Sequence, residues 1–437
     1  MEKREFLPSL KDGWTRKAAI VSLAVLAFLI PYTSDSFVVL AFLGSLTIAI
    51  ALLGMDLCAR RMVLGPWQKA LFFSALAYGV YFALAVMVSP ANDFRMLQWG
   101  WLLSGLALLV SVVFTAPSRR EARTILISLV AGGVISGALG VWQYLRTGVH
   151  AHGLATMNSN TFGGYLVAVA PVAIAWFFAA RGKWERLLAG AGFLIVVAAL
   201  IFTFCRGSIV ALFAAGFCIS WWLRSCWIVP GLGSYYYILS KTIAPSAYQR
   251  FAPLVTGTLD SSSTSRLQLW RAALELWKTR PVFGVGIGRY RLLAPDLGLP
   301  KTAIFEFGSK GRHSLSCHNS YLEILAEQGL TGLTILLALL VVFFFPVLRR
   351  LFVPDFRSKP IPYMGAGLSK SGFIAGRKPA DPWLAGMAGG VVGFLVHNLT
   401  NSLFLYNGVS WAGWLLLGLA VCRVKTEGEG GEPACVS

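Results

Sequence analysis

The sequence predicts an all-α integral membrane protein: a polytopic helical bundle of about 12 transmembrane helices, with a long, partly helical loop outside the membrane. Of its 437 residues, 56% are hydrophobic and only 13% are charged. The mean hydropathy of +0.67 is far outside the range of a soluble domain of this size. The apolar residues also fall in runs near the roughly twenty residues that a helix needs to cross the hydrocarbon.

Twelve apolar runs are candidates for these helices. The first is short, and the ninth is interrupted by Pro230, Gly231 and Gly233, so these two are the weakest candidates. The runs lie near residues 18–31, 37–54, 67–88, 97–116, 124–145, 162–180, 187–204, 209–223, 227–239, 330–348, 384–403 and 409–422.

The basic residues predict the orientation of the bundle. The net charge is +19, and its Lys and Arg residues cluster in alternate loops between apolar runs instead of along one amphipathic face. That pattern excludes a nucleic-acid partner and, because short cytoplasmic loops carry the excess of basic residues, places both termini in the cytoplasm. The expected organisation is nine helices in 1–240, an extracytoplasmic loop in 241–329, three helices in 330–423 with a basic cytoplasmic loop at 349–383, and a disordered cytoplasmic tail in 424–437.

The long loop is expected to be functional, because connections of this length seldom lack a role. Its stretch "LDSSSTSRLQLWRAALELWKTRP" has serine hydroxyls for an N-cap and apolar residues at helical spacing, which predicts an amphipathic helix that ends before Pro281. Arg266 would lie in the first turn of this helix, where free N–H groups favour an anion. The alternative is that Arg266 only extends to the headgroups or pairs with Asp260.

The glycines that follow are interpreted as a tight turn. Gly284, Gly286 and Gly288 in "PVFGVGIGRY" do not have nucleotide-loop spacing, and no strand precedes them.

Two further residues stand out against an apolar background. Arg206, in "FCRGS" between the seventh and eighth helices, is costly near lipid and is expected to face a polar cavity, the alternative being extension to the outer headgroups. His318, in "CHNSYLEILAEQGL", has a pKa suited to taking a proton from a hydroxyl, with Asn319 available to orient its ring. An isolated histidine is otherwise a packing or capping residue, and His313 competes for the same role.

One polar pair falls inside the eleventh apolar run. His397 and Asn401, in "VHNLTNSLF", are one turn apart and would either line the cavity or hydrogen-bond with each other.

These motifs resemble those of a known family. "MNSNTFGGYLVAVAP", "CRGSIVAL", "SRLQLWRAALELWKTRPVFGVG" and "HNSYLEILAEQGLTGL" are similar, in this order, to the recognisable stretches of the O-antigen ligase and polymerase superfamily. The resemblance implies a glycosyltransferase of the bacterial inner membrane, with a periplasmic active site and no metal or cofactor. Its donor would be an undecaprenyl-diphosphate-linked O-antigen glycan and its acceptor a lipid A–core sugar, so that the chain would act in lipopolysaccharide biosynthesis.

The resemblance also implies roles for residues. Arg206 and Arg266 would hold the diphosphate, with Arg271 as a competing match for Arg266, and His318 would activate the acceptor hydroxyl. A single displacement of this kind inverts the anomeric centre. The further candidates for substrate contact are Asn319, Arg289, His313 and Asn160.

Three other activities remain open at this stage. Within the same superfamily, the chain could be a polysaccharide polymerase or a protein O-oligosaccharyltransferase. From a different class, it could be a transporter of the lipid-linked sugar, although transporters more often have inverted repeats and charges at mid-membrane.

Overall fold

The computed structural model describes residues 9–32, 64–153, 158–257, 260–299, 304–306, 312–352, 380–406 and 409–424. These residues are almost entirely helical, apart from one short antiparallel pair of strands in which Phe305 faces His313. The elements are α1 (Ser9–Leu29), η1 (Ile30–Tyr32), α3 (Pro66–Val88), α4 (Asp93–Thr115), α5 (Arg119–Thr147), α6 (Ser159–Ala179), α7 (Lys183–Phe202), α8 (Arg206–Leu223), α9 (Ile228–Thr242), α10 (Pro245–Thr256), α11 (Ser261–Thr279), α12 (Tyr290–Leu293), η2 (Ala294–Leu297), β1 (Ile304–Glu306), β2 (Arg312–Ser314), α13 (Ser320–Phe352), α14 (Pro382–His397), α15 (Leu403–Tyr406) and α16 (Ser410–Arg423).

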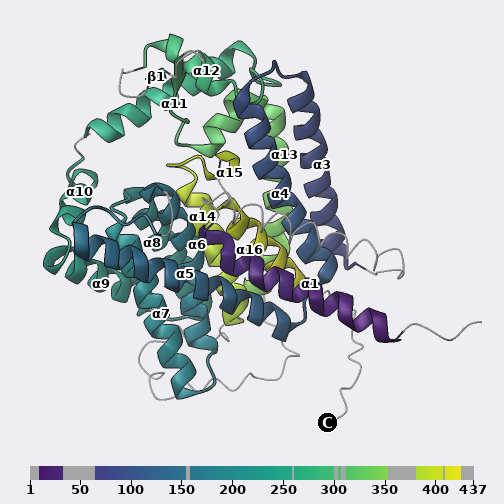
Figure 1. Ribbon diagram of the computed structural model, residues 1–437, viewed down its shortest axis with the longest axis vertical. Coiled ribbons are helices and arrows are strands. Elements are labelled where there is room, and N and C mark those ends of the chain that lie inside the picture. Colours follow the sequence, from purple (N-terminus) through teal and green to yellow (C-terminus); the bar gives the residue numbers. More distant parts are fainter. Residues whose placement is uncertain are drawn as a thin grey trace, which may run out of the picture.

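The long helices form one bundle, and the predicted loop helix lies at its end. Helix α14 packs against α6 and α8, α16 packs against α4 and α14, and α3 packs between α4 and α13. Figure 1 shows α11, α12 and β1 together at the top of the molecule, with α14 and α15 below them and α3, α4 and α13 on the right. The described part of the loop is therefore largely helical, as the amphipathic pattern predicts.

Among the described residues, seven helices are long and apolar enough to cross a membrane: α3, most of α4, α5, α6, α7, α8 and α13. Three shorter apolar helices, comprising residues 17–32, α14 and α16, add to these. We therefore treat the chain as a multi-pass membrane protein. Of the twelve predicted spans, 37–54 lies outside the described residues, and 227–239 corresponds to α9, whose 15 residues are too few for a full span.

Contacts between helix ends show which termini share an end of the bundle. Arg123 near the start of α5 forms an ion pair with Glu185 near the start of α7, and Arg423 at the end of α16 pairs with Asp381 before α14. The basic clusters at the starts of α5 and α7 therefore lie near each other, as the alternation of charge predicts. The side of the membrane that they occupy stays a prediction.

Two helix boundaries differ from those predicted. Helix α14 ends at His397, so Asn401 lies in the turn after it and not in the same span as the histidine. Helix α13 begins at Ser320 instead of 330, and Gly329 interrupts it with non-helical angles (φ 67°, ψ −166°). Leucines and phenylalanines continue the apolar run after His397, which is why hydropathy alone places the end of α14 too late.

The interruption at Gly329 is where the loop joins the bundle. The backbone N–H groups of Leu330 and Thr331 donate to the carbonyls of Pro281 and Val282, and Val285 N donates to Ala326 O. Gly284, Gly286 and Gly288 all have positive φ, so the predicted tight turn is confirmed. The segment that contains these glycines therefore connects the end of α11 to α13 through backbone hydrogen bonds.

Candidate functional site

Arg206 is the first residue of α8 and is largely buried. Its side chain is 11% exposed, and Nη2 lies 2.6 Å from Oδ2 of Asp260. The other terminal nitrogen, Nη1, is buried with no hydrogen-bond partner among the described residues. A buried, paired guanidinium does not fit the headgroup alternative and leaves one set of N–H donors for an anion.

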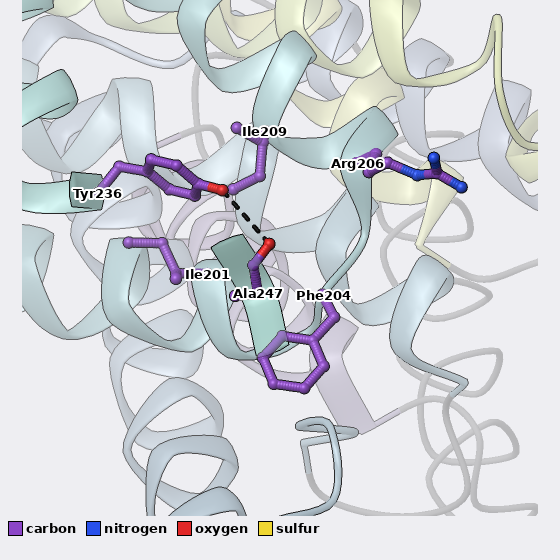
Figure 2. Close-up of a pocket in the computed structure, with 6 residues that line it drawn as sticks. All are labelled: Ile201, Phe204, Arg206, Ile209, Tyr236 and Ala247. Atoms are coloured by element: carbon purple, nitrogen blue, oxygen red, sulfur yellow. Dashed lines mark hydrogen bonds between the residues drawn. The ribbon is translucent and has the colours of Figure 1, made fainter. Parts of the chain in front are cut away.

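An apolar hollow lies next to Arg206. It is lined by Ile201, Phe204, Ile209, Tyr236 and Ala247 together with Arg206. In Figure 2 the Arg206 side chain points away from the other five residues, so its guanidinium lies at the edge of this hollow and not on its floor. Phe204, two residues before the arginine, has a positive φ of 55°, a conformation that costs a non-glycine residue about 1–3 kcal/mol and is common at functional sites.

Arg266 lies close to Arg206. It is in the second turn of α11, whereas the sequence predicts the first turn. Asp260, and not a serine hydroxyl, is the N-cap of α11, so that Arg266 is in the second turn. Burial is the main cause that lowers the pKa of Arg266, and the charges of Arg206 and Arg250 lower it further. Cys205 and Asp260 act in the opposite direction and raise this pKa. The predicted alternative of an ion pair between Arg266 and Asp260 is replaced by the pair with Arg206.

Asp260 is the counter-charge of this cluster. Partial burial raises its pKa, but hydrogen bonds from Ser263 and Arg206 outweigh this effect and hold the pKa at about 2. It is therefore ionised at neutral pH. One carboxylate thus faces the guanidiniums of Arg206 and Arg266, which leaves a positive local charge.

His318 lies just before α13 in a strained conformation. Its φ is 52°, in the left-handed region that favours glycine, and its Nδ1 is buried with no hydrogen-bond partner among the described residues. Burial and the charges of Arg266 and Arg291 lower its pKa to about 4, and the Asn401 side chain, which lies within hydrogen-bonding reach of the ring, partly opposes this shift. The ring is therefore neutral at pH 7 and able to accept a proton.

The residues after His318 hold the start of α13. The side chain of Asn319 accepts hydrogen bonds from the backbone of Tyr321 and Leu322, so it caps the helix and does not orient the histidine ring as predicted. The buried carboxylate of Glu323 accepts from Cys317 N and from Ser402 Oγ. Glu323 thus fixes the residue before the histidine to the turn that follows α14.

His397 joins three helices and does not bond with Asn401. Its Nε2 lies 3.1 Å from the carbonyl oxygen of Asn160, which can only accept, so Nε2 carries the proton. Its Nδ1 then accepts from Ser208 Oγ at 3.4 Å. The sequence alternative of a mutual His397–Asn401 bond is therefore wrong.

Glycines allow these segments to approach closely. A Cβ at Gly163 would lie 2.2 Å from Ser208 Oγ, and a Cβ at Gly207 would lie 2.0 Å from Thr400 Oγ1. The glycines of "NTFGG" and "CRGS" therefore bring α6, α8 and the turn after α14 together behind Arg206.

The remaining candidates are placed less centrally. Arg271 is exposed, and the guanidinium of Arg289 donates to Val285 O within its own loop. Asn160 contributes its backbone carbonyl to His397. His313 lies in β2, and its side chain is outside the described residues.

Arg291 is a site residue that the sequence pattern does not indicate. Its charge acts on His318, and its guanidinium lies 5.1 Å from the centre of the Phe94 ring. It is one of several arginines in a polar loop, so that only the folded chain singles it out.

The arrangement combines an anion-binding part with a basic nitrogen. Arg266 acts electrostatically on both Arg206 and His318, so the three residues from α8, α11 and the start of α13 form one site. Across the described ranges, no three His, Cys, Asp or Glu side chains gather as a metal site requires. A site of this kind can hold a phosphorylated group beside a hydroxyl that loses its proton.

Fold and site together define a multi-pass helical membrane protein with a cationic site where helix ends meet. Residues 149–337 match the family described as O-Antigen ligase, so the family resemblance in the motifs is confirmed for this segment. The chain is also similar to the exopolysaccharide production protein ExoQ of Rhizobium meliloti (strain 1021), with 25% identity over 381 residues, 82% of each chain. These similarities support a ligase or polymerase that acts on polysaccharide in a membrane.

Proposed function

We propose that this protein is a glycosyltransferase of the bacterial inner membrane that transfers a glycan from undecaprenyl diphosphate to a sugar hydroxyl at the periplasmic face. The observation that carries the proposal is the meeting of Arg206, Arg266 and His318 from three separate elements. The family match over residues 149–337 supports the same reaction class.

The guanidiniums would bind the diphosphate of the donor. Asp260 holds Nη2 of Arg206, whereas Nη1 has no partner in the part of the chain that the structure describes, and Arg266 adds a second positive charge. Charge accumulates on the diphosphate as its bond to the sugar breaks. Fixed donors aimed at that charge stabilise the transition state more than the ground state.

His318 would be the general base. Its low pKa of about 4 keeps the ring neutral, and its buried Nδ1 is able to accept the proton of the acceptor hydroxyl. The acceptor oxygen forms a bond to the anomeric carbon, and the bond from that carbon to the diphosphate breaks. A single displacement inverts the anomeric centre, and the site as we describe it uses arginine charge in place of a metal.

The acceptor defines two versions of this function. The family description favours a lipid A–core sugar, as in an O-antigen ligase. The relative from Rhizobium meliloti, which matches 82% of this chain, is named for exopolysaccharide production, and a polymerase that extends one lipid-linked glycan with another would fit such a role. Both versions require the same donor site.

Reconstitution of the purified protein tests this proposal. Proteoliposomes would receive an undecaprenyl-diphosphate-linked glycan and either rough lipopolysaccharide or a second lipid-linked glycan, with EDTA present, and product would be followed by gel shift. We expect transfer by the wild type and a loss of at least about a hundredfold in Arg206→Ala and His318→Ala. Lys278→Ala, an exposed cation at the other end of α11, is the matched control.

The outcomes separate the alternatives. Product on only one acceptor assigns the ligase or the polymerase version. Intact donor with no product on either acceptor contradicts transfer to these sugars, and movement of the donor to the opposite leaflet would indicate a transporter. Full activity in both site variants would contradict the proposed site.

A further inference from the structure

Asn401 lies between the two parts of the proposed site, although it is far from both in sequence. Its backbone carbonyl accepts hydrogen bonds from the backbone N (3.1 Å) and the side-chain Oγ (3.2 Å) of Ser320. Ser320 is two residues after His318. The preceding Thr400 packs directly against Gly207, the residue after Arg206. The turn after α14 therefore contacts the segments that carry both functional side chains.

The orientation of the Asn401 carboxamide follows from its neighbour. The backbone N–H of Ser402, which can only donate, lies 2.9 Å from one end of the amide, so that end is the oxygen Oδ1. The amino group Nδ2 therefore points the other way. It is buried in a side chain that is 7% exposed, and it has no hydrogen-bond partner among the described residues.

Within the described part of the chain, Nδ2 is one of three buried polar atoms at this site that have no hydrogen-bond partner. The other two are Nη1 of Arg206 and Nδ1 of His318. The Asn401 side chain lies within hydrogen-bonding reach of the His318 ring and raises the pKa of that ring. Buried polar atoms in folded proteins are nearly always satisfied, so these three atoms from neighbouring segments are available to hydrogen-bond a bound ligand. Two of them are donors, and Nδ1 of the neutral histidine accepts in the tautomer that carries its proton on Nε2.

We propose that Asn401 binds the acceptor sugar, donating a hydrogen bond from Nδ2 to an oxygen of that sugar next to the hydroxyl that attacks. This inference rests on the proposed glycan transfer. The attacking oxygen gains the anomeric carbon and gives its proton to Nδ1 of His318, while the electron pair of the broken bond leaves with the diphosphate. Asn401 takes no proton and fixes which hydroxyl faces the histidine.

The acceptor is favoured over the donor for a reason of charge. The diphosphate already has the guanidiniums of Arg206 and Arg266, whereas Asn401 offers a neutral amide beside the base. Neutral amide donors match neutral hydroxyls, and a sugar carries several of these close together. Residue 401 also lies beyond the family match, which ends at residue 337, so the acceptor side of the site would be built by a separate segment.

Steady-state transfer kinetics of the reconstituted full chain test this proposal. Rough lipopolysaccharide, or the octyl glycoside of one repeat unit if the wild type polymerises, would be varied at fixed donor, and the donor would then be varied at fixed acceptor. Asn401→Asp keeps a side-chain oxygen that accepts from Ser402 N and replaces the N–H hydrogen-bond donor Nδ2 by an oxygen that can only accept. Asn401→Ala removes both groups. Thr400→Ser changes the same turn while it keeps the hydroxyl that donates to His397 O, and is the control.

We expect both Asn401 variants to raise the acceptor KM by about three- to tenfold, the loss that follows from one hydrogen bond. The donor KM should stay within about twofold, and Thr400→Ser should behave as the wild type. An unchanged acceptor KM in both variants, or an equal rise in donor KM, would overturn the proposal. The melting temperature of each variant separates misfolding from loss of binding. We expect Asn401→Asp to keep the fold, because it retains the oxygen that accepts from Ser402 N.

A direct binding measurement keeps this test independent of catalysis. The dissociation constant of the same acceptor would be measured without donor for the wild type and Asn401→Asp. A weaker constant in the variant supports the role of Asn401 even if the wild type transfers nothing, an outcome that would instead reject the proposed function. Equal constants would overturn the inference.

Discussion

At the residue scale, His318 owes its neutral state to its surroundings. Burial lowers its pKa first, and the charges of Arg266 and Arg291 lower it further, to about 4. Bound diphosphate would offset the charge of Arg266. The pKa of the ring would then rise when the glycan donor binds. The histidine is therefore unprotonated before the donor binds, and its affinity for a proton is higher when the acceptor hydroxyl attacks.

Removal of the Arg266 charge should move the pH dependence of the reaction. The histidine must be neutral, so activity is lost as pH falls through its pKa, and in the wild type the acid limb of kcat/KM should lie near pH 4. In Arg266→Gln the acid limb should move to higher pH. It should not reach 6.5, the ordinary pKa of histidine, because burial and Arg291 still lower the pKa of His318. Residual single-turnover transfer measured across pH would show this shift.

The control for this prediction is Lys278→Gln, which removes an exposed charge from the same helix. Its acid limb should coincide with that of the wild type, and intrinsic fluorescence at each pH would exclude unfolding. A limb in Arg266→Gln that stays in place or moves to lower pH would show that Arg266 does not act on the base.

Some of these residues could be found from the sequence and others could not. Arg206 stands in an apolar environment and His318 is an isolated ring beside a helix, so both are visible as chemical outliers. Arg291 and the role of Asn401 depend on contacts between segments far apart in the chain. Adjacency in the sequence predicts Asn319 as the partner of the histidine, but in the structure its side-chain oxygen caps α13 instead.

At the element scale, close packing of α8 against the turn after α14 sets the position of Arg206. Gly207 makes this approach possible, since Thr400 Oγ1 would be 2.0 Å and Thr400 Cβ 3.0 Å from an added methyl group. The helical runs themselves follow from hydropathy and are largely predictable. Their ends and their mutual approach depend on polar contacts that hydropathy does not report, as the early end of α14 shows.

Substitution Gly207→Ala should therefore reduce both stability and transfer. Overpacking of this kind costs about 1–3 kcal/mol, and the movement of α8 that relieves it displaces Arg206. Thr400→Gly in the same chain removes the clashing side chain and should restore part of the melting temperature and part of the activity. Thermal unfolding and transfer assays of the single and double variants measure both effects.

Gly100→Ala provides the matched control, because the residue lies inside α4 and, outside its own helix backbone, no atom of the described residues is within 4 Å of an added Cβ. It should leave stability unchanged or slightly raised, since alanine favours helix. Equal behaviour of Gly207→Ala and Gly100→Ala would contradict the packing that we describe.

At the scale of the whole molecule, the site gathers the N-terminal ends of four helices. Helices α6, α8, α11 and α13 begin at residues 159, 206, 261 and 320, each next to a site segment. Helix N-termini carry partial positive charge and add to that of the arginines, so the end of the bundle as a whole suits an anionic headgroup. The side of the membrane and the full number of spans remain predictions from the charge pattern.

The most direct test of this account compares two arginines of α11 in the reconstituted transfer assay. Arg266 lies in the site, whereas Arg271 is exposed five residues later and was the competing match from the sequence. We predict that Arg266→Ala lowers transfer by at least about a hundredfold and weakens donor binding, while Arg271→Ala retains most of the activity. Loss of transfer in Arg271→Ala with retention in Arg266→Ala would contradict the site.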